Sequence, residues 1–170
     1  MLIDITNITS VLKIFGYDTN DLVNVIYKNN LIEKIEVKKF NKSFCIIIDK
    51  SKIDYNNIIL TCKFNIFGPS KIHVYKCFDL INNIIIYKVL RIEYYNSNYK
   101  LHRFGGPSKI IYNINCNLIF EAYFNNGLLH NTVGPAYRYF NTYSKRWFNL
   151  YYINGRSITF DEFQFLIDLL

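Results

Sequence analysis

Histidines are the residues of this sequence best suited to acid–base or metal-ligand chemistry. His102 and His130 share similar sequence surroundings, and a glutamate, Glu93 or Glu121, precedes each histidine by nine residues. Because imidazole changes charge near neutral pH, a Glu–His pair could act as a general base. A pair that occurs twice is more often structural, since catalysis normally needs one asymmetric group of residues. We therefore expect each histidine to hold the loop before a Gly-Pro, with a Glu–His contact inside each unit as an alternative.

A zinc site would have to be built around the cysteines. His73 and Cys77 have a His-x-x-x-Cys spacing, and Cys62 or Cys116 would have to help complete four ligands. These cysteines and Cys45 form no Cys-x-x-Cys pair. We expect no metal and no cofactor, and we interpret the cysteines as buried thiols in a reducing compartment.

Motifs for nucleophilic catalysis are missing from the sequence. There is no Gly-x-Ser-x-Gly and no Gly-rich phosphate loop, and aspartates are sparse. We therefore predict a protein that is not an enzyme. An enzyme built on the Glu–His pairs is the third hypothesis, behind two kinds of binding protein.

Tyrosine, tryptophan and arginine form a candidate binding surface. These residue types dominate the binding energy of protein interfaces, and aromatic rings interleaved with arginine can also stack on nucleic-acid bases. From strand alternation, Tyr95, Tyr123 and Tyr151 are expected to face the core and their neighbours to face solvent. The candidate surface consists of Tyr94, Arg103, Tyr137, Arg138, Arg146, Trp147 and Tyr152.

Charge and composition bound the choice of partner. The formal net charge is +7, which could favour a polyanion. However, basic residues are scattered, and lysine is enriched with Ile, Asn and Tyr as in proteins of A/T-rich genomes. A protein partner is therefore the leading hypothesis, and a nucleic acid is the weaker one. The longest apolar stretches have four residues, so we expect no transmembrane segment.

The residues named so far recur in a repeat. Glu93–Ser108 and Glu121–Ala136 align with seven identities in sixteen positions, and the offset from Glu93 to Glu121 defines the repeat period. A third copy begins one further period along the chain. The repeated positions are Glu93, Tyr95, Asn98, His102, Gly106 and Pro107, then Glu121, Tyr123, Asn126, His130, Gly134 and Pro135, then Tyr151 and Asn154.

A degenerate copy lies upstream. Gly68–Ile72 repeats the pentapeptide Gly106–Ile110 at an offset longer than the repeat period, which indicates an insertion of about ten residues around Asp79–Ile86. Gly-Pro interrupts a strand ladder because proline has no N–H, so the second strand of each unit is expected to begin just after it.

Each unit is predicted to be a β-hairpin followed by a loop. Asn126-Gly127 and Asn154-Gly155 indicate tight type I′ turns, whereas Asn98-Tyr99 lacks the glycine and should form a looser turn. Partial alternation and many β-branched and aromatic residues predict the strands. These are Val89–Tyr95, Ile110–Ile114, Leu118–Phe124, Ala136–Phe140 and Trp147–Ile153.

The ends of the chain differ from the repeats. Asp18–Asn29 is predicted to be a short helix, followed by strands at Leu31–Lys39 and Ser43–Ile48. Thr159–Glu162 forms a capping-box pattern, which predicts an amphipathic helix over the last eleven residues. We expect one compact, mainly β domain, an antiparallel sheet of repeated hairpins. Its parts would be an N-terminal cap (1–50), the repeats (51–158) and a C-terminal capping helix (159–170).

Two segments resemble a known repeat family. Asn126–Ala136, NGLLHNTVGPA, and Asn154–Phe163, NGRSITFDEF, are similar to the MORN-variant repeats, β-hairpin units common in large DNA viruses, phages and bacteria. The resemblance covers roughly residues 93–170, and it implies a β-repeat scaffold and a viral or similarly A/T-rich source, without known catalytic residues. Departures from the fuller pattern occur at Tyr99 in place of Gly, Asn131 in place of Arg and Ile158 in place of His.

These features together favour a binding or scaffold protein. The start of the chain, MLIDITNITS, has an aspartate where a signal peptide would be basic or apolar, so we expect no secretion and a cytoplasmic location, the host cytoplasm if the protein is viral.

Overall fold

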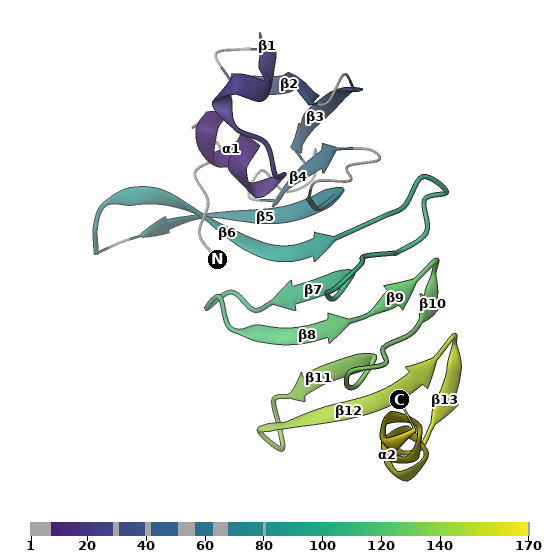
Figure 1. The fold of residues 1–170 in the computed structure, drawn as a ribbon. Helices are drawn as coiled ribbons and strands as arrows, with labels where there is room; N and C mark the ends of the chain where they lie inside the picture. The colour runs from purple at the N-terminus through teal and green to yellow at the C-terminus, as the bar shows by residue number, and fades with distance from the viewer. Residues whose placement is uncertain are drawn as a thin grey trace. The chain divides into compact units, whose positions relative to one another are not determined.

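The structure, a computed structural model, describes residues 8–28, 31–39, 42–50, 57–62, 68–79 and 81–169 of the chain. It divides into two compact units, Met1–Glu93 and Tyr94–Leu170. Within each unit, antiparallel strands are joined largely by hairpins (Figure 1). A short helix lies near the start of the described chain and another near its end. Because most of the described elements are strands, the predicted mainly β class is confirmed.

The first unit is an antiparallel sheet whose strands pair in chain order. The core of this unit is apolar, and its side chains come from the helix and from the strands. Along a strand, every second side chain points to the same face, and β-branched and leucine side chains occupy the face that forms the core. Fully buried members are Val11, Leu12, Phe15, Ile35, Leu60, Ile72 and Val89. The elements are α1 (Ile8–Ile14), the 3-10 turn η1 (Thr19–Asp21), β1 (Leu22–Lys28), β2 (Leu31–Lys39), β3 (Lys42–Lys50), β4 (Asn57–Cys62), β5 (Lys71–Asp79) and β6 (Ile84–Glu93).

The helix predicted over Asp18–Asn29 is wrong. The Asp18 carboxylate accepts a hydrogen bond from the Asn20 N–H at 2.7 Å, and η1 follows. The chain then forms β1, whose β-branched residues favour a strand, and β1 pairs with β2 in a hairpin. Cross-strand pairing therefore overrides the helical spacing of the apolar residues. Asn29 itself lies outside the described residues, while the predicted strands after it are confirmed as β2 and β3.

The predicted insertion lies at the end of the β5–β6 hairpin. Asp79 pairs with Ile84, so the extra residues lengthen both strands and their turn. Figure 1 shows this hairpin in blue-green as a long twisted ribbon. The Gly-Pro before β5 is fixed by packing: a Cβ on Gly68 would lie 2.4 Å from the Phe15 carbonyl oxygen, so only glycine fits.

The second unit repeats one pattern of hairpins. Its sheet has the strand order β7, β8, β11, β12, β13, and β9 and β10 form a separate two-stranded hairpin. The predicted strands Ile110–Ile114, Ala136–Phe140 and Trp147–Ile153 are present as β7, β11 and β12, whereas the predicted strand Leu118–Phe124 is divided between β8 and β9, which belong to different sheets. Both β7 and β11 begin two residues after a Gly-Pro, as expected. The elements are β7 (Lys109–Tyr112), β8 (Leu118–Ala122), β9 (Phe124–Asn125), β10 (Leu128–Leu129), β11 (Tyr137–Asn141), β12 (Arg146–Ile153), β13 (Arg156–Ile158) and α2 (Phe160–Asp168).

The two Asn-Gly turns have the predicted geometry. Asn126 and Gly127 have φ of 50° and 86°, and Asn154 and Gly155 have φ of 49° and 83°. Positive φ at both residues is what a type I′ turn requires, and asparagine and glycine tolerate it best.

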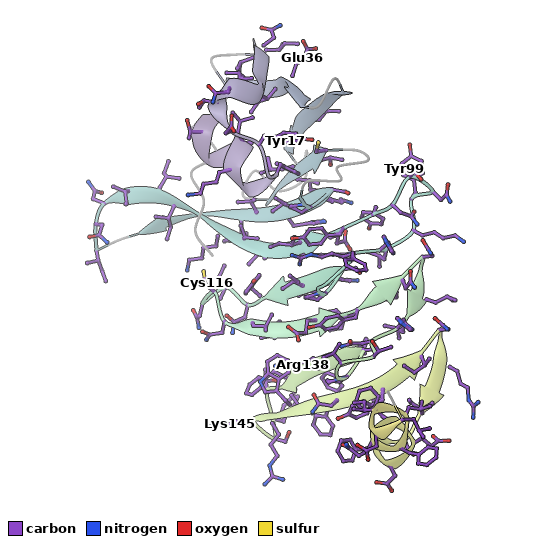
Figure 2. The ribbon with its side chains drawn as sticks, in the orientation of Figure 1. Tyr17, Glu36, Tyr99, Cys116, Arg138 and Lys145 are labelled. Atoms are coloured by element: carbon purple, nitrogen blue, oxygen red, sulfur yellow. The ribbon has the colours of Figure 1, made fainter. Side chains whose placement is uncertain are left out.

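Other turns are held by asparagine side chains. The Oδ1 of Asn96 accepts hydrogen bonds from the N–H groups of Asn98 and Lys100. Asn113 does the same in the β7–β8 turn and Asn141 in the β11–β12 turn, where Figure 2 marks Cys116 and Lys145. Asparagine is therefore used structurally here as well as being abundant.

The C-terminal helix begins as the capping box predicts. Thr159 is the N-cap, and its side chain and that of Glu162 bond reciprocally to the other's backbone. Phe163 is buried, whereas Phe160 and Leu166 are exposed. Within the described part of the chain no helix is long and apolar enough to span a membrane. Most of the segment assessed for a signal peptide, residues 1–7, lies outside the described residues.

Candidate functional site

Strand register separates the predicted binding residues into two groups. Tyr137 pairs with Leu150 on β12, whereas Arg138 pairs with Asn149. Because side chains alternate along a strand, neighbours in sequence point to opposite faces. Tyr137, Arg146 and Tyr152 therefore share one face of the second unit, and Arg138 and Trp147 share the other. Tyr94 and Arg103 come from the segment before β7.

One face carries a row of aromatic rings together with a leucine, which we call the ring face: Phe120, Tyr137, Tyr139, Phe148 and Leu150. The Phe120 and Tyr137 rings meet edge to face at 4.9 Å, and the Tyr139 and Phe148 rings stack at 5.3 Å. Phe148 and Leu150 each remain 43% exposed. The ring face is therefore ordered by ring contacts and still open to solvent.

Basic side chains flank the ring face. The Lys109 ammonium lies 5.8 Å from the centre of the Phe120 ring. Arg146 is exposed, and it pairs with Asn141 next to the β11–β12 turn, away from Lys109.

On the other face, arginine covers aromatic rings. The Arg138 guanidinium lies 4.6 Å above the Trp147 ring, and the Arg103 guanidinium lies 4.1 Å above the Tyr94 ring. These cation–π contacts occupy one side of each ring. Trp147 also contacts Phe140 at 5.7 Å.

The repeat histidines hold turns, but in the following repeat. The Nδ1 of His102 accepts a hydrogen bond from the Asn126 N–H at 3.2 Å, and the Nδ1 of His130 accepts one from the Asn154 N–H at 3.1 Å. An accepting Nδ1 is unprotonated, so each ring is neutral in this arrangement. The two bonds are identical in sequence separation, and each one joins consecutive repeats.

The Gly-Pro loops are closed by different side chains in the same way. Arg103 Nη1 donates to the Pro107 carbonyl at 3.3 Å, and Asn131 Nδ2 donates to the Pro135 carbonyl at 3.0 Å. Asn131 replaces the arginine of the repeat pattern, yet it fills the same role four residues before the proline. Sequence comparison alone shows a departure where the structure shows an equivalent contact.

Both repeat glutamates pair with arginine. Glu121 Oε1 lies 3.3 Å from Arg138 Nε, and Glu93 accepts from Arg91 Nε at 2.8 Å. The second tyrosine of the repeat, Tyr123, is also linked to Glu121: burial raises the pKa of its phenol most, and the negative charge and hydrogen bond of Glu121 raise it further. Arg138 and Arg103 oppose this rise.

The repeat tyrosines differ in their surroundings. Tyr151 packs against the rings of Phe163 and Phe160, at 4.7 and 5.5 Å, and so lies under α2. Tyr123 is half-buried in the wall of a pocket. Tyr95 is half-buried and forms an isolated β-bridge with Leu101. Of the three tyrosines that were expected to face the core, Tyr151 therefore fits the expectation best.

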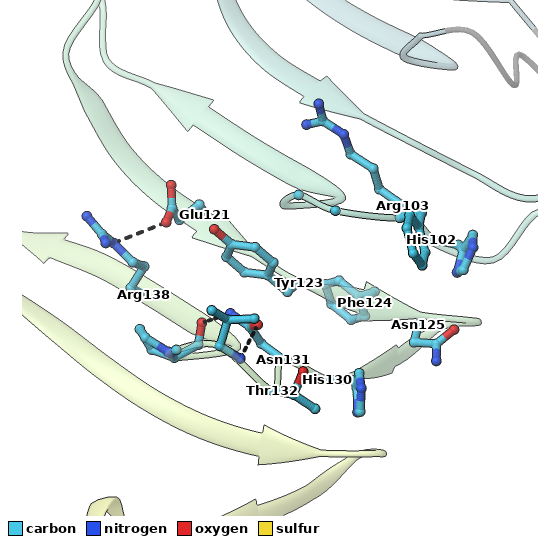
Figure 3. A pocket seen from close by; sticks show the side chains of 16 residues that line it. His102, Arg103, Glu121, Tyr123, Phe124, Asn125, His130, Asn131, Thr132 and Arg138 are labelled. Atoms are coloured by element: carbon cyan, nitrogen blue, oxygen red, sulfur yellow. Dashed lines mark hydrogen bonds and ion pairs between the residues drawn. The ribbon is translucent and has the colours of Figure 1, made fainter. Parts of the chain in front are cut away.

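A pocket of about 600 Å³ lies between the two Gly-Pro loops of the second unit. Figure 3 shows Glu121 and Arg138 joined on adjacent strands, with the Tyr123 ring beside them. Sequence reasoning missed this pocket, although the repeat positions that line it were identified. Its lining includes His102, Glu121, Tyr123, His130, Asn131 and Arg138.

Metal-ligating side chains are not grouped among the residues that the structure describes. No three of His, Cys, Asp and Glu there lie close enough to hold a metal ion. Cys116 is a free thiol, and Cys62 is buried beside the Tyr17 hydroxyl at 3.8 Å. The side chains of Cys45 and Cys77 lie outside the described ones.

No protein family, curated protein or solved structure matches this chain.

Proposed function

We propose that the second unit is a non-enzymatic protein-binding or scaffold module whose interaction surface is the ring face. The observation that supports this most is the row of ordered, half-exposed rings on the face opposite to Tyr151 and α2. Aromatic side chains contribute large apolar area at low entropic cost, and their contacts with one another already fix their positions.

Charge suggests the character of the partner. Lys109 lies beside the Phe120 ring, and Arg146 is exposed at the end of β12 nearest Phe148. An apolar partner surface edged by carboxylates would complement both the rings and these cations. The partner class is therefore a protein with an acidic rim around an apolar patch.

A nucleic-acid partner has less support. A base stacks on the open side of an aromatic ring, and guanidinium groups already cover one side of the Tyr94 and Trp147 rings. We keep nucleic-acid binding as the alternative to be tested.

The repeats are proposed to be of the MORN-variant type. Equivalent hydrogen bonds recur one repeat period apart: Gly127 N–H to Leu101 O and Gly155 N–H to Leu129 O, both at 2.8 Å. The free thiol of Cys116 supports a reducing compartment such as the cytoplasm.

Site-specific photo-crosslinking in the native host cell tests the proposal. A benzophenone side chain would replace Phe148 on the ring face and, as the matched control, Tyr143, which is 97% exposed in the β11–β12 turn. We expect one protein to be captured at position 148 and not at position 143.

Two outcomes would overturn the proposal. One is equal capture at both positions or at neither. The other is capture of nucleic acid at position 148. Sedimentation of the purified protein separates a different partner from a second copy of this chain, because self-association alone would give a concentration-dependent dimer.

A further inference from the structure

We propose that the pocket between the two Gly-Pro loops binds a neutral polyhydroxylated ligand, a carbohydrate of one or two sugar residues. This inference is independent of the ring face, since it uses residues of the opposite face of β8 and β11 and the loops around 102–106 and 130–135. Its failure would leave the protein-binding proposal untouched.

An ion pair determines the charge of the ligand. Glu121 and Arg138 lie 3.3 Å apart and line the pocket, with 14% and 35% of their side chains exposed. A hydroxyl group can donate to the carboxylate and accept from the guanidinium. A third charged group, Arg103, also lines the pocket, and its guanidinium is held over the Tyr94 ring and donates to the Pro107 carbonyl. An anion would meet the charge of Glu121 and a cation those of Arg138 and Arg103, so a neutral ligand with adjacent hydroxyls fits the ion pair best.

Neutral polar groups extend the same pattern. The rings of His102 and His130 line the pocket, and because their Nδ1 atoms accept backbone hydrogen bonds, the rings are uncharged. Each neutral ring then carries its proton on Nε2, which makes it a donor. The Thr132 hydroxyl also belongs to the lining and can donate or accept.

Aromatic rings supply the apolar part of the wall. Tyr123 and Phe124 line the pocket and are half-buried. The Tyr123 ring lies beside the ion pair of Glu121 and Arg138, as Figure 3 shows. A pyranose has an apolar face of C–H groups and a rim of hydroxyls, so it can contact the ring and the ion pair at once.

Hydrogen bonds within its loops hold the pocket in shape. Its volume of about 600 Å³ falls in the range typical of small-molecule sites, about 300–1,000 Å³. The loop of Asn131 is fixed twice, by its donation to Pro135 and by the Val133 N–H that donates to its Oδ1 at 3.0 Å. Preformed loops lower the ordering cost of binding.

The single tryptophan provides a direct measurement. Trp147 lies 4.6 Å below the Arg138 guanidinium, so a ligand that contacts Arg138 should change its fluorescence. The full chain would be titrated with maltose, cellobiose, lactose and N,N′-diacetylchitobiose at 50 and 500 mM NaCl. We expect a saturable change with at least one of these sugars and the same affinity at both salt concentrations, because the ligand is neutral.

Variants then locate the site. Glu121→Gln keeps the size of the side chain and removes the charge, and we expect it to weaken binding at least tenfold. Tyr123→Phe keeps the ring and should weaken binding less. Phe148→Ala, on the ring face, is the matched control and should bind the sugar as the native chain does. Should Glu121→Gln unfold the protein, saturation-transfer NMR of the native chain gives a separate readout, in which sugar protons must receive saturation from aromatic protons.

Three results would overturn the proposal. The first is no saturable response to any of the four sugars up to 50 mM together with no saturation transfer. The second is a site that inorganic phosphate fills with salt-dependent affinity, which would make it an anion site. The third is loss of sugar binding in Phe148→Ala while Glu121→Gln binds normally.

Discussion

A histidine that accepts a backbone hydrogen bond has a role different from that of a general base. His102 and His130 each use Nδ1 to hold the N–H of the asparagine that starts the next turn. Their recurrence at the repeat period indicated a structural role, because a catalytic pair would not be duplicated with its surroundings. It did not indicate the partner, which lies 24 residues further along the chain.

Replacing either histidine should loosen the turn of the following repeat. His130→Ala removes the acceptor of the Asn154 N–H. Because this bond is exposed, water can replace it, and we expect a loss of about 0.5–1 kcal/mol in the free energy of unfolding. Urea denaturation measures this loss, and amide exchange should accelerate at Asn154. Tyr143→Ser, at an exposed turn, is the control. Unchanged amide exchange at Asn154 would show that this hydrogen bond does not stabilise the turn.

The asparagine that departs from the repeat pattern can be tested by restoring the pattern. Asn131→Ala removes the donor to Pro135 and the acceptor of the Val133 N–H, and should cost about 1–2 kcal/mol. Asn131→Arg should recover part of this loss, since Arg103 makes the equivalent bond to Pro107. Thermal unfolding of the three proteins gives the order native, Asn131→Arg, Asn131→Ala. An arginine variant that is less stable than the alanine variant would contradict the equivalence.

At the scale of elements, short sequence patterns predicted the structure correctly where a local hydrogen bond or a backbone angle defines the element. Asn126-Gly127 and Thr159–Glu162 specify a turn and a helix start through side chain and φ alone, and the structure contains both. Asp18–Asn29 failed because its apolar spacing fits a helix as well as a strand. The pairing of β1 with β2 determines that this segment is a strand, and this pairing cannot be recognised from the sequence of one segment alone.

The capping box gives the C-terminal helix a pH dependence. Glu162 accepts hydrogen bonds from the Thr159 N–H and hydroxyl, and the backbone bond is the main reason that its pKa is lowered, with Arg156 a smaller one. A carboxyl whose pKa is lower in the folded state stabilises the fold above its unfolded pKa, and this contribution is lost as pH falls through the folded pKa.

We therefore expect α2 to fray in acid. Amide exchange at Phe163, measured by NMR as the pH is lowered through the range in which the Glu162 carboxyl titrates, should accelerate beyond the intrinsic pH effect. Glu162→Gln can still reach back to the Thr159 N–H without a charge, so it should show less of this pH dependence. Identical pH profiles for the two proteins would mean that the carboxylate does not stabilise the helix.

At the scale of the whole molecule, the repeating features could be predicted from the sequence, whereas the pocket that neighbouring repeats form could not. The repeat period, the strands and the Gly-Pro corners were all visible in the residue order. The pocket was not, because Glu121 and Arg138 meet only through the pairing of β8 with β11, which are separated by the β9–β10 hairpin. Likewise, the predicted surface joined Tyr137 to Arg138, while strand alternation places them on opposite faces.

The distribution of charge over the molecule argues against tight binding of nucleic acid. Residues 1–93 contain 13 basic and 9 acidic residues, and residues 94–170 contain 7 and 4, so the two units carry formal charges of +4 and +3. Because the positive charge is divided between the two units, we expect few phosphates to be neutralised at once. Each phosphate contact adds about 0.9 to the slope of log K against log salt on duplex DNA, so we expect a slope of magnitude below about 3. Fluorescence anisotropy with a labelled 20-base-pair duplex at 50 to 200 mM NaCl measures it, with Arg146→Ala as a comparison. Micromolar affinity with a steep slope that this substitution lowers by about one would identify a phosphate contact at Arg146 and reverse the order of the two proposed partners.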